Sequence, residues 1–128
     1  MEWQDHRCDR FFTGGFLSIA VAALDKRITF LAPVHDAMCD YEAEIHGVAG
    51  GWPHYFYKED KALGAAWKEQ KLTDLEKARL EGARYYDGVN FARRITVPGW
   101  YSFGYNDEVV PPTSSYGLYN SVKAPKTL

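Results

Sequence analysis

The sequence has few cysteines, and their spacing forms no recognisable site. Cys8 and Cys39 are the only two in 128 residues, and neither belongs to a CxxC pair. Small disulfide-stabilised proteins and zinc domains use more cysteines at closer, repeated spacings. The sequence therefore implies neither a disulfide framework nor a structural zinc site. We expect two free thiols, that of Cys39 buried.

Long apolar runs and an excess of charge of one sign are also missing. The longest apolar stretch, residues 16–24, is interrupted by Ser18 and is far too short to span a bilayer. Residues 1–7 are charged and no signal-peptide core follows them, so no export address is expected and the localisation stays open. The formal net charge is only -2, with 15 basic and 17 acidic residues. We therefore expect no nucleic-acid partner and no membrane partner.

The remaining composition is that of one small globular domain spanning residues 1–128. The chain is 46% hydrophobic and 25% charged, with a mean hydropathy of -0.40, which excludes global disorder. No repeat or interdomain linker is visible. The aromatic content of 16% is expected mainly to fill the core, although exposed rings can also stack on sugars.

The first quarter of the chain predicts a strand, a helix and a second strand. Residues 10–13 form a short apolar stretch that suits a buried strand ending at a tight turn of two glycines. Residues 16–24 are rich in alanine and aliphatic residues, which favours a helix packed on a sheet. Residues 28–34 predict a second buried strand, with Pro33 near its end. This order is the unit of a parallel sheet.

Further helices are predicted between this unit and residue 86. Residues 40–46 suit a short helix, which the glycine-rich loop at 47–53 ends. Residues 61–86 are rich in Ala, Leu, Lys and Glu and predict one or two solvent-facing helices. Thr73 is placed to act as an N-cap where this region is interrupted.

The last third predicts one more strand and one more helix. Residues 95–104 read as a third strand, and Pro98 indicates that pairing begins after it or at a sheet edge. Two prolines, Pro111 and Pro112, suit the start of a helix that continues to Ser121.

Several motifs resemble one enzyme family. Residues 86–98 read YDGVNFARRITVP, which is similar to the D-x-V-N-F-A-x-R-I-x-x-P run of the acetyl xylan esterase and cephalosporin-C deacetylase family, carbohydrate esterase family seven. The runs DEVVPPT at 107–113 and APK at 124–126 follow in the family's order. Residues 15–27 resemble the helix after the family's nucleophile. The resemblance extends over most of the chain.

The resemblance implies an α/β-hydrolase fold and a Ser–His–Asp triad of which only Asp107 is present. In this family the serine occupies a G-x-S-x-G elbow between a strand and a helix. Here only two glycines separate Thr13 from Phe16, so we expect the serine to be missing, and Ser18 lies too far inside the helix to replace it. The family's histidine follows the APK run, and that position is not occupied by any of the chain's four histidines, His6, His35, His46 and His54.

Other interpretations of these residues stay open. Asp107 could be an ordinary loop carboxylate near a helix start, although the motif favours the acid position. His35, Cys39 and His46 could suggest a metal cluster, but their spacing matches no zinc pattern and the family uses no metal. We expect no metal and no cofactor.

Two further segments have a functional and a structural interpretation. The loop at 52–55 could contact a sugar or a neighbouring subunit, or it could pack within the chain. Arg93 and Arg94 could bind substrate, but pairing of one of them with Asp87 or Glu81 is the preferred interpretation.

Together these features predict a partial α/β-hydrolase fold with about three parallel strands and helices on both faces. The resemblance implies a carboxylic ester hydrolase that removes acetyl groups from xylan, xylo-oligosaccharides or cephalosporin C, so the expected ligand is an acetylated carbohydrate. We expect this chain to be a truncated and inactive form. The alternative is a non-catalytic binding or assembly piece, which complements another chain or forms a homo-oligomer.

Overall fold

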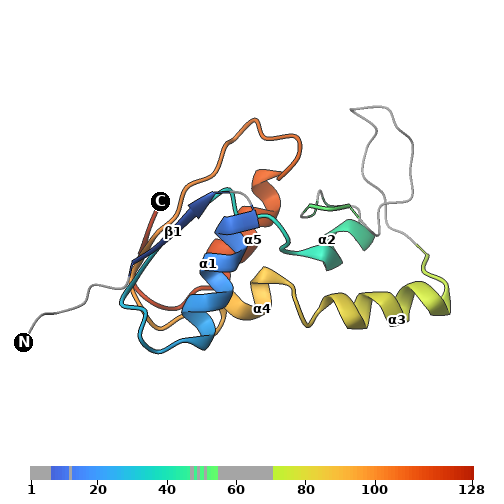
Figure 1. Cartoon of the computed structure of the whole chain (residues 1–128). Helices are drawn as coiled ribbons and strands as arrows, with labels where there is room; N and C mark the ends of the chain where they lie inside the picture. The colour runs from blue at the N-terminus through green and yellow to red at the C-terminus, as the bar shows by residue number, and fades with distance from the viewer. Residues whose placement is uncertain (1–6, 12, 47, 49, 51, 55–70) are drawn as a thin grey trace, which may run out of the picture.

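The computed structural model describes residues 7–11, 13–46, 48, 50, 52–54 and 71–128, the first of these segments as backbone only (Figure 1). Residues 61–70 of the predicted helical region and part of the predicted loop at 47–53 lie outside the described residues.

A parallel sheet of four strands lies at the centre of the described structure. Its order is that of the chain: β1 (Arg7–Phe11), β2 (Phe30–Val34), β3 (Gly99–Trp100) and β4 (Lys126–Thr127). All three neighbouring pairs are parallel, and an isolated bridge between Val34 and Ser102 extends the pairing of β2 with the segment after β3. The carboxyl ends of the strands therefore meet at one edge of the sheet.

The sheet confirms the predicted α/β class with about three parallel strands, and β4 is an additional strand that the sequence did not indicate. The first strand ends at Phe11 rather than at Thr13, because Thr13 already begins a helix. Pro33 lies near the end of β2, as expected. The third strand is much shorter than predicted, and it begins at Gly99, directly after Pro98.

Three helices form one connected layer beside the sheet. α1 (Thr13–Leu24) packs on β1 and β2, and it also contacts α4 (Gly88–Ala92), which in turn contacts α5 (Pro112–Ser121). α2 (Tyr41–Ile45) and α3 (Asp74–Ala83) contact each other, and α3 lies at the end of the molecule away from β1 (Figure 1). Helices on the second face of the sheet stay a prediction.

The core lies between this helix layer and the sheet. Ile19, Leu31 and Leu118 have no exposed surface, and Tyr101 is 1% exposed. Burial of each such side chain stabilises the fold by roughly 1.5–3 kcal/mol. The apolar residues within 16–24 and 28–34 therefore contribute to the core, as predicted for a helix packed on a sheet and a buried strand.

Side-chain caps fix the starts of two helices. The Thr73 hydroxyl accepts a hydrogen bond from the Glu76 N–H, and the Glu76 carboxylate accepts one from the Thr73 N–H at 2.7 Å, which confirms Thr73 as an N-cap. α5 follows the two prolines as predicted. α4 was not predicted as a helix, and its N-cap is Asp87. No helix among the described residues has the length and apolar character needed to cross a membrane.

Gly15 allows the first turn of α1 to approach the end of β2 closely. A Cβ atom at Gly15 would lie 2.8 Å from the Val34 carbonyl oxygen and 3.1 Å from that of His35, whereas one at Gly82 in α3 would meet nothing within 4 Å. We predict that Gly15→Ala lowers the free energy of unfolding by about 1–3 kcal/mol through overpacking.

Gly82→Ala is the matched control, and it should raise the free energy of unfolding by about 0.5–1 kcal/mol because alanine favours an exposed helix. Urea denaturation of both variants measures the difference. Equal stability of the two variants would contradict the close contact between α1 and β2.

Candidate active site

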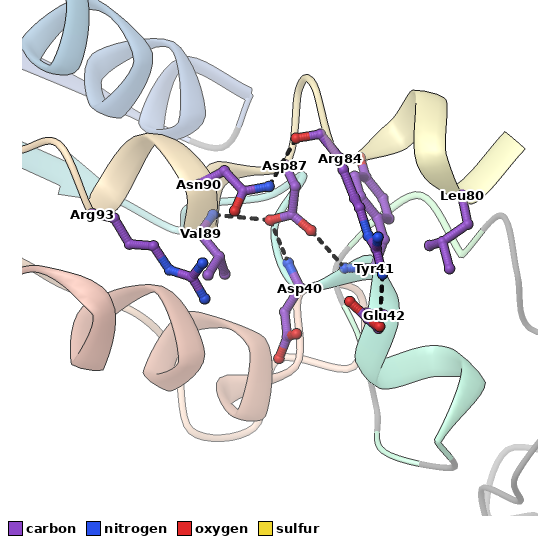
Figure 2. Close-up of a pocket in the computed structure, with 9 residues that line it drawn as sticks. All are labelled: Asp40, Tyr41, Glu42, Leu80, Arg84, Asp87, Val89, Asn90 and Arg93. Atoms are coloured by element: carbon purple, nitrogen blue, oxygen red, sulfur yellow. Dashed lines mark hydrogen bonds and ion pairs between the residues drawn. The ribbon is translucent and has the colours of Figure 1, made fainter. Parts of the chain in front are cut away.

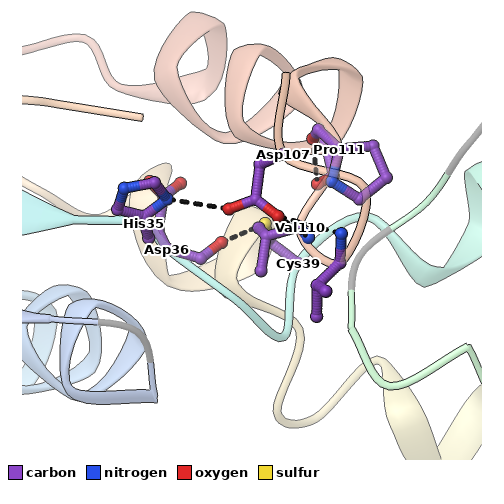
Figure 3. Close-up of polar contacts among 8 residues, drawn as sticks. His35, Asp36, Cys39, Asp107, Val110 and Pro111 are labelled. Carbon is purple, nitrogen blue, oxygen red and sulfur yellow. Dashed lines mark hydrogen bonds and ion pairs between the residues drawn. The ribbon is translucent and has the colours of Figure 1, made fainter. Parts of the chain in front are cut away.

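Asp107 lies in the loop between β3 and α5, at the carboxyl edge of the sheet. Its Oδ1 accepts hydrogen bonds from the N–H groups of Val109 and Val110, at 2.9 and 2.8 Å. Its Oδ2 lies 2.9 Å from Nδ1 of His35 (Figure 3). Both carboxylate oxygens are therefore engaged, and one of them faces a histidine.

These hydrogen bonds lower the pKa of Asp107 below its ordinary value. Partial burial, the largest single influence, raises the pKa, but the two backbone N–H groups and the imidazole of His35 together outweigh it. The carboxylate is therefore ionised at neutral pH and can accept hydrogen bonds from N–H donors.

His35 follows β2 directly and is held in an unusual backbone conformation. Its φ is 51°, in the left-handed region that few residues other than glycine and asparagine adopt. Its N–H donates to the Ser102 carbonyl at 2.9 Å, and its own carbonyl accepts from the Ala37 N–H at 2.9 Å. These bonds fix the residue on the same edge as Asp107.

The sequence analysis singled out Asp107 as the acid but did not predict that His35 would contact it. The sequence did contain a clue to this contact. Residues 28–34 and 95–104 were both predicted as strands of a parallel sheet, and His35 and Asp107 follow these strands. Carboxyl ends of parallel strands meet at one edge. The contact was not evident from the sequence because the two residues are 72 positions apart.

Comparison with known proteins identifies the family. The model of the acetyl xylan esterase (AXE1) family matches residues 11–128. The chain belongs to the acetyl xylan esterase family. It is 40% identical over 113 residues to the acetyl esterase Axe7A of Xylanibacter ruminicola, a match that covers 88% of this chain and 23% of that protein.

Solved structures of acetyl xylan esterases have the same fold. The enzyme from Thermoanaerobacterium sp. JW/SL YS485 matches 99% of this chain with a TM-score of 0.72 and 22% identity, over 38% of its own length. The enzyme from Paenibacillus sp. R4 matches 91% of this chain with a TM-score of 0.67 and 24% identity, over 35% of its length. The chain thus spans about a quarter of the curated relative and just over a third of each solved structure.

The sequence resemblance led us to expect the family's nucleophile elbow between β1 and α1. No serine precedes Ser18 in the sequence. Ser18 is fully buried in α1, and its hydroxyl donates to the Gly14 carbonyl at 2.9 Å. The two glycines lie in the first turn of α1 rather than in a separate tight turn, which corrects the sequence prediction.

A second carboxyl group, Asp36, is buried beside this edge. It is 1% exposed, and neither of its oxygens bonds to another described residue. Burial raises the pKa of Asp36 to about 7, opposed only by its own backbone N–H. The Cys39 thiol donates to the Asp36 carbonyl at 2.9 Å (Figure 3). Burial and then the Asp36 charge raise the pKa of Cys39, which favours the protonated thiol.

A third carboxyl group, Asp87, joins α4 to the segment before α2. Its Oδ1 accepts from the N–H groups of Asp40 and Val89, both at 2.9 Å, and its Oδ2 accepts from the Tyr41 N–H at 3.0 Å (Figure 2). Beside it lies a polar pocket of about 320 Å³ between α2, α3 and α4. The residues labelled in Figure 2 line this pocket.

The arginine pairing in this region differs from the prediction. Glu81 pairs with Arg84 at 2.7 Å, and Arg84 also reaches Glu42 at 2.9 Å. Asp87 accepts from backbone N–H groups, so neither acidic residue pairs with Arg93 or Arg94. The prediction was wrong because three backbone donors converge on Asp87, which the sequence does not reveal.

The loop after α2 packs within the chain at its described residues. The Trp52 carbonyl accepts from the Met38 N–H at 2.9 Å. The His54 Nδ1 lies 3.6 Å from the buried Glu44 carboxylate. These contacts agree with the packing interpretation of this loop.

The burial of Asp36, whose carboxyl has no hydrogen-bond partner among the described residues, predicts a pH-dependent stability. Because the folded state holds the proton up to about pH 7 whereas the unfolded carboxyl releases it near 3.8, stability falls as pH rises between these values. Relative to Asp36→Asn, the wild-type chain should lose about 3 kcal/mol of unfolding free energy between pH 5 and pH 8, at about 1.4 kcal/mol per pH unit below 7.

Urea titrations at both pH values test this expectation, with Asp74→Asn as the control because the Asp74 side chain is fully exposed. An unchanged difference between wild type and Asp36→Asn across this range would show that Asp36 is compensated.

Asp87 should contribute strongly to stability through its three backbone partners. Asp87→Ala leaves these buried and half-buried N–H groups without an acceptor, so we expect a loss of about 3 kcal/mol or more. Asp87→Asn keeps the shape and one acceptor oxygen and should cost less. Chemical denaturation measures both, and a loss below about 1 kcal/mol for Asp87→Ala would contradict this role.

Proposed function

We propose that this chain forms the acid-bearing part of an acetyl-ester hydrolase site and has no serine-dependent esterase activity as it stands. The observation that carries the proposal is Asp107, an ionised carboxylate at the carboxyl edge of the sheet, with one oxygen fixed by two backbone N–H groups and the other facing an imidazole. A triad acid has this task, since it orients a histidine and remains ionised.

The β1–α1 junction supports the second part of the proposal. A serine nucleophile must stand at the entrance of the helix, where it can reach both substrate and base. The first hydroxyl at this entrance belongs to Thr13, which begins α1 and is exposed, and the first serine is the buried Ser18. Without a serine nucleophile, acetyl transfer to the protein does not proceed by the family's route.

Acetylated carbohydrates are the proposed ligand class. The curated relative is named an acetyl esterase, and two of the matching structures are acetyl xylan esterases. The 40% identity to the former extends over 113 residues, 88% of this chain.

Assembly with another polypeptide is the second candidate. Among the described strands β1 pairs only with β2, so one backbone edge of β1 has no described partner. An open edge is a ready template for a further strand. A complementing chain or a second copy would join at this edge.

A serine-directed fluorophosphonate probe, together with acetate release from acetylated xylan, tests the proposal. We expect no labelling of the purified chain and acetate release equal to the buffer blank. A serine acetyl esterase serves as positive control, and Ser18→Ala as the matched variant.

Stoichiometric labelling that persists in Ser18→Ala would reveal another activated hydroxyl, such as that of Thr13. Labelling of this kind, or acetate release above the blank, would overturn the proposal.

A further inference from the structure

We propose that His35 and Asp107 form a proton-transfer pair in which His35 is the catalytic base for attack of water on activated acetyl esters. This activity is separate from serine chemistry, and it rests on the proposed function only in the role of Asp107 as the acid. Asp107 is the positioning residue, because it acts through His35.

The tautomer of His35 follows from its contact with Asp107. The ionised carboxylate has no proton to donate, so the proton in the 2.9 Å contact belongs to Nδ1 of His35. In the neutral imidazole Nε2 then carries the lone pair and is a proton acceptor. Nε2 points away from Asp107 in Figure 3, and the structure records no contact for it among the described residues.

The ring is accessible. The His35 side chain is 36% exposed, so water and a small ester can reach it. Gly104 lies beside both partners, since a Cβ atom there would come within 3.2 Å of the ring Cε1 and 3.6 Å of the Asp107 Cβ. Because glycine has no side chain, the space next to this contact stays open.

Backbone strain indicates that this orientation is imposed by the fold. A non-glycine residue with a φ of 51° is strained, and such residues cluster at functional sites. Met38 and Asp40 also have a positive φ, but His35 is the one whose side chain contacts the ionised carboxylate, and bonds to Ser102 and Ala37 hold its backbone. Backbone strain and the contact with Asp107 therefore coincide on one side chain.

The proposed step conserves atoms and charge. The water oxygen bonds to the acyl carbon as its proton passes to Nε2, and the carbonyl electron pair moves to the oxygen. The adduct then collapses, the bond to the phenolate breaks, and the imidazolium returns the proton to the phenolate or to solvent. The products are acetic acid and the phenol. No cofactor or oxidant takes part.

Aryl acetates are the proposed substrate class because a phenolate leaves readily. Alkyl acetates such as acetylated xylan need a stronger nucleophile and stabilisation of the oxyanion. The substrates proposed for the His35–Asp107 pair, aryl acetates, therefore differ from the acetylated carbohydrates of the family's serine-dependent reaction.

Hydrolysis of p-nitrophenyl acetate by the full chain tests the proposal. His35→Asn removes the base and suits the left-handed backbone, and Asp107→Asn removes the orienting charge. Each change should lower the rate above blank by at least about tenfold, a modest part of the 10²–10⁴-fold typical of general bases. The double variant should be no slower than His35→Asn, since the two residues act as a unit. His46→Asn is the matched control for an exposed histidine.

Chemical rescue keeps the test decisive where a variant folds poorly. His35→Gly tolerates the backbone conformation and opens space for free imidazole beside Asp107. Added imidazole should restore a rate above that of imidazole alone, and this gain should vanish in His35→Gly combined with Asp107→Asn.

Rates in His35→Asn equal to wild type would overturn the proposal, as would a stable acetyl adduct on His35 found by mass spectrometry, which indicates a nucleophile rather than a base. A slower wild-type rate in D₂O supports proton transfer from water. The fluorophosphonate result is independent: labelling overturns the proposed function and leaves the histidine assay to be read on its own variants.

Discussion

The parallel direction of all described strands is the constraint on which the rest of the structure depends. It brings the ends of β2 and β3 to one edge, and so places His35 beside Asp107 although they are 72 positions apart in the sequence. The same constraint requires α1 to start close to the end of β2, which Gly15 permits because it has no side chain. The start of α1, His35 and the loop that carries Asp107 therefore lie close together.

Three carboxyl groups show how their surroundings decide their state. Asp87 accepts three backbone N–H groups and serves as a structural link. Asp107 accepts hydrogen bonds from two backbone N–H groups and faces an imidazole, which keeps the carboxylate ionised at an accessible edge. Asp36 has no partner among the described residues and retains its proton up to about pH 7. Hydrogen-bond donors, not burial alone, separate these roles.

The sequence predicted what depends on local pattern and missed what depends on tertiary contact. Apolar runs located β2, α1 and the core, capping chemistry located Thr73, and two consecutive prolines located the start of α5. α4 and β4 were missed because each is short and gains its stability from neighbours. The motif at 107–113 identified Asp107, but its histidine contact depends on the register of the sheet. The partners of Glu81 and Asp87 likewise depend on how α3 and α4 pack.

The central claim is that Asp107 fixes the tautomer of His35. Nitrogen-15 NMR of the histidine rings at pH 8, in the wild-type chain and in Asp107→Asn, tests this claim most directly. The account predicts a protonated Nδ1 and an unprotonated Nε2 for His35 in the wild type, and loss of this preference in the variant. A proton on Nε2 in the wild type, or identical spectra in both chains, would contradict it.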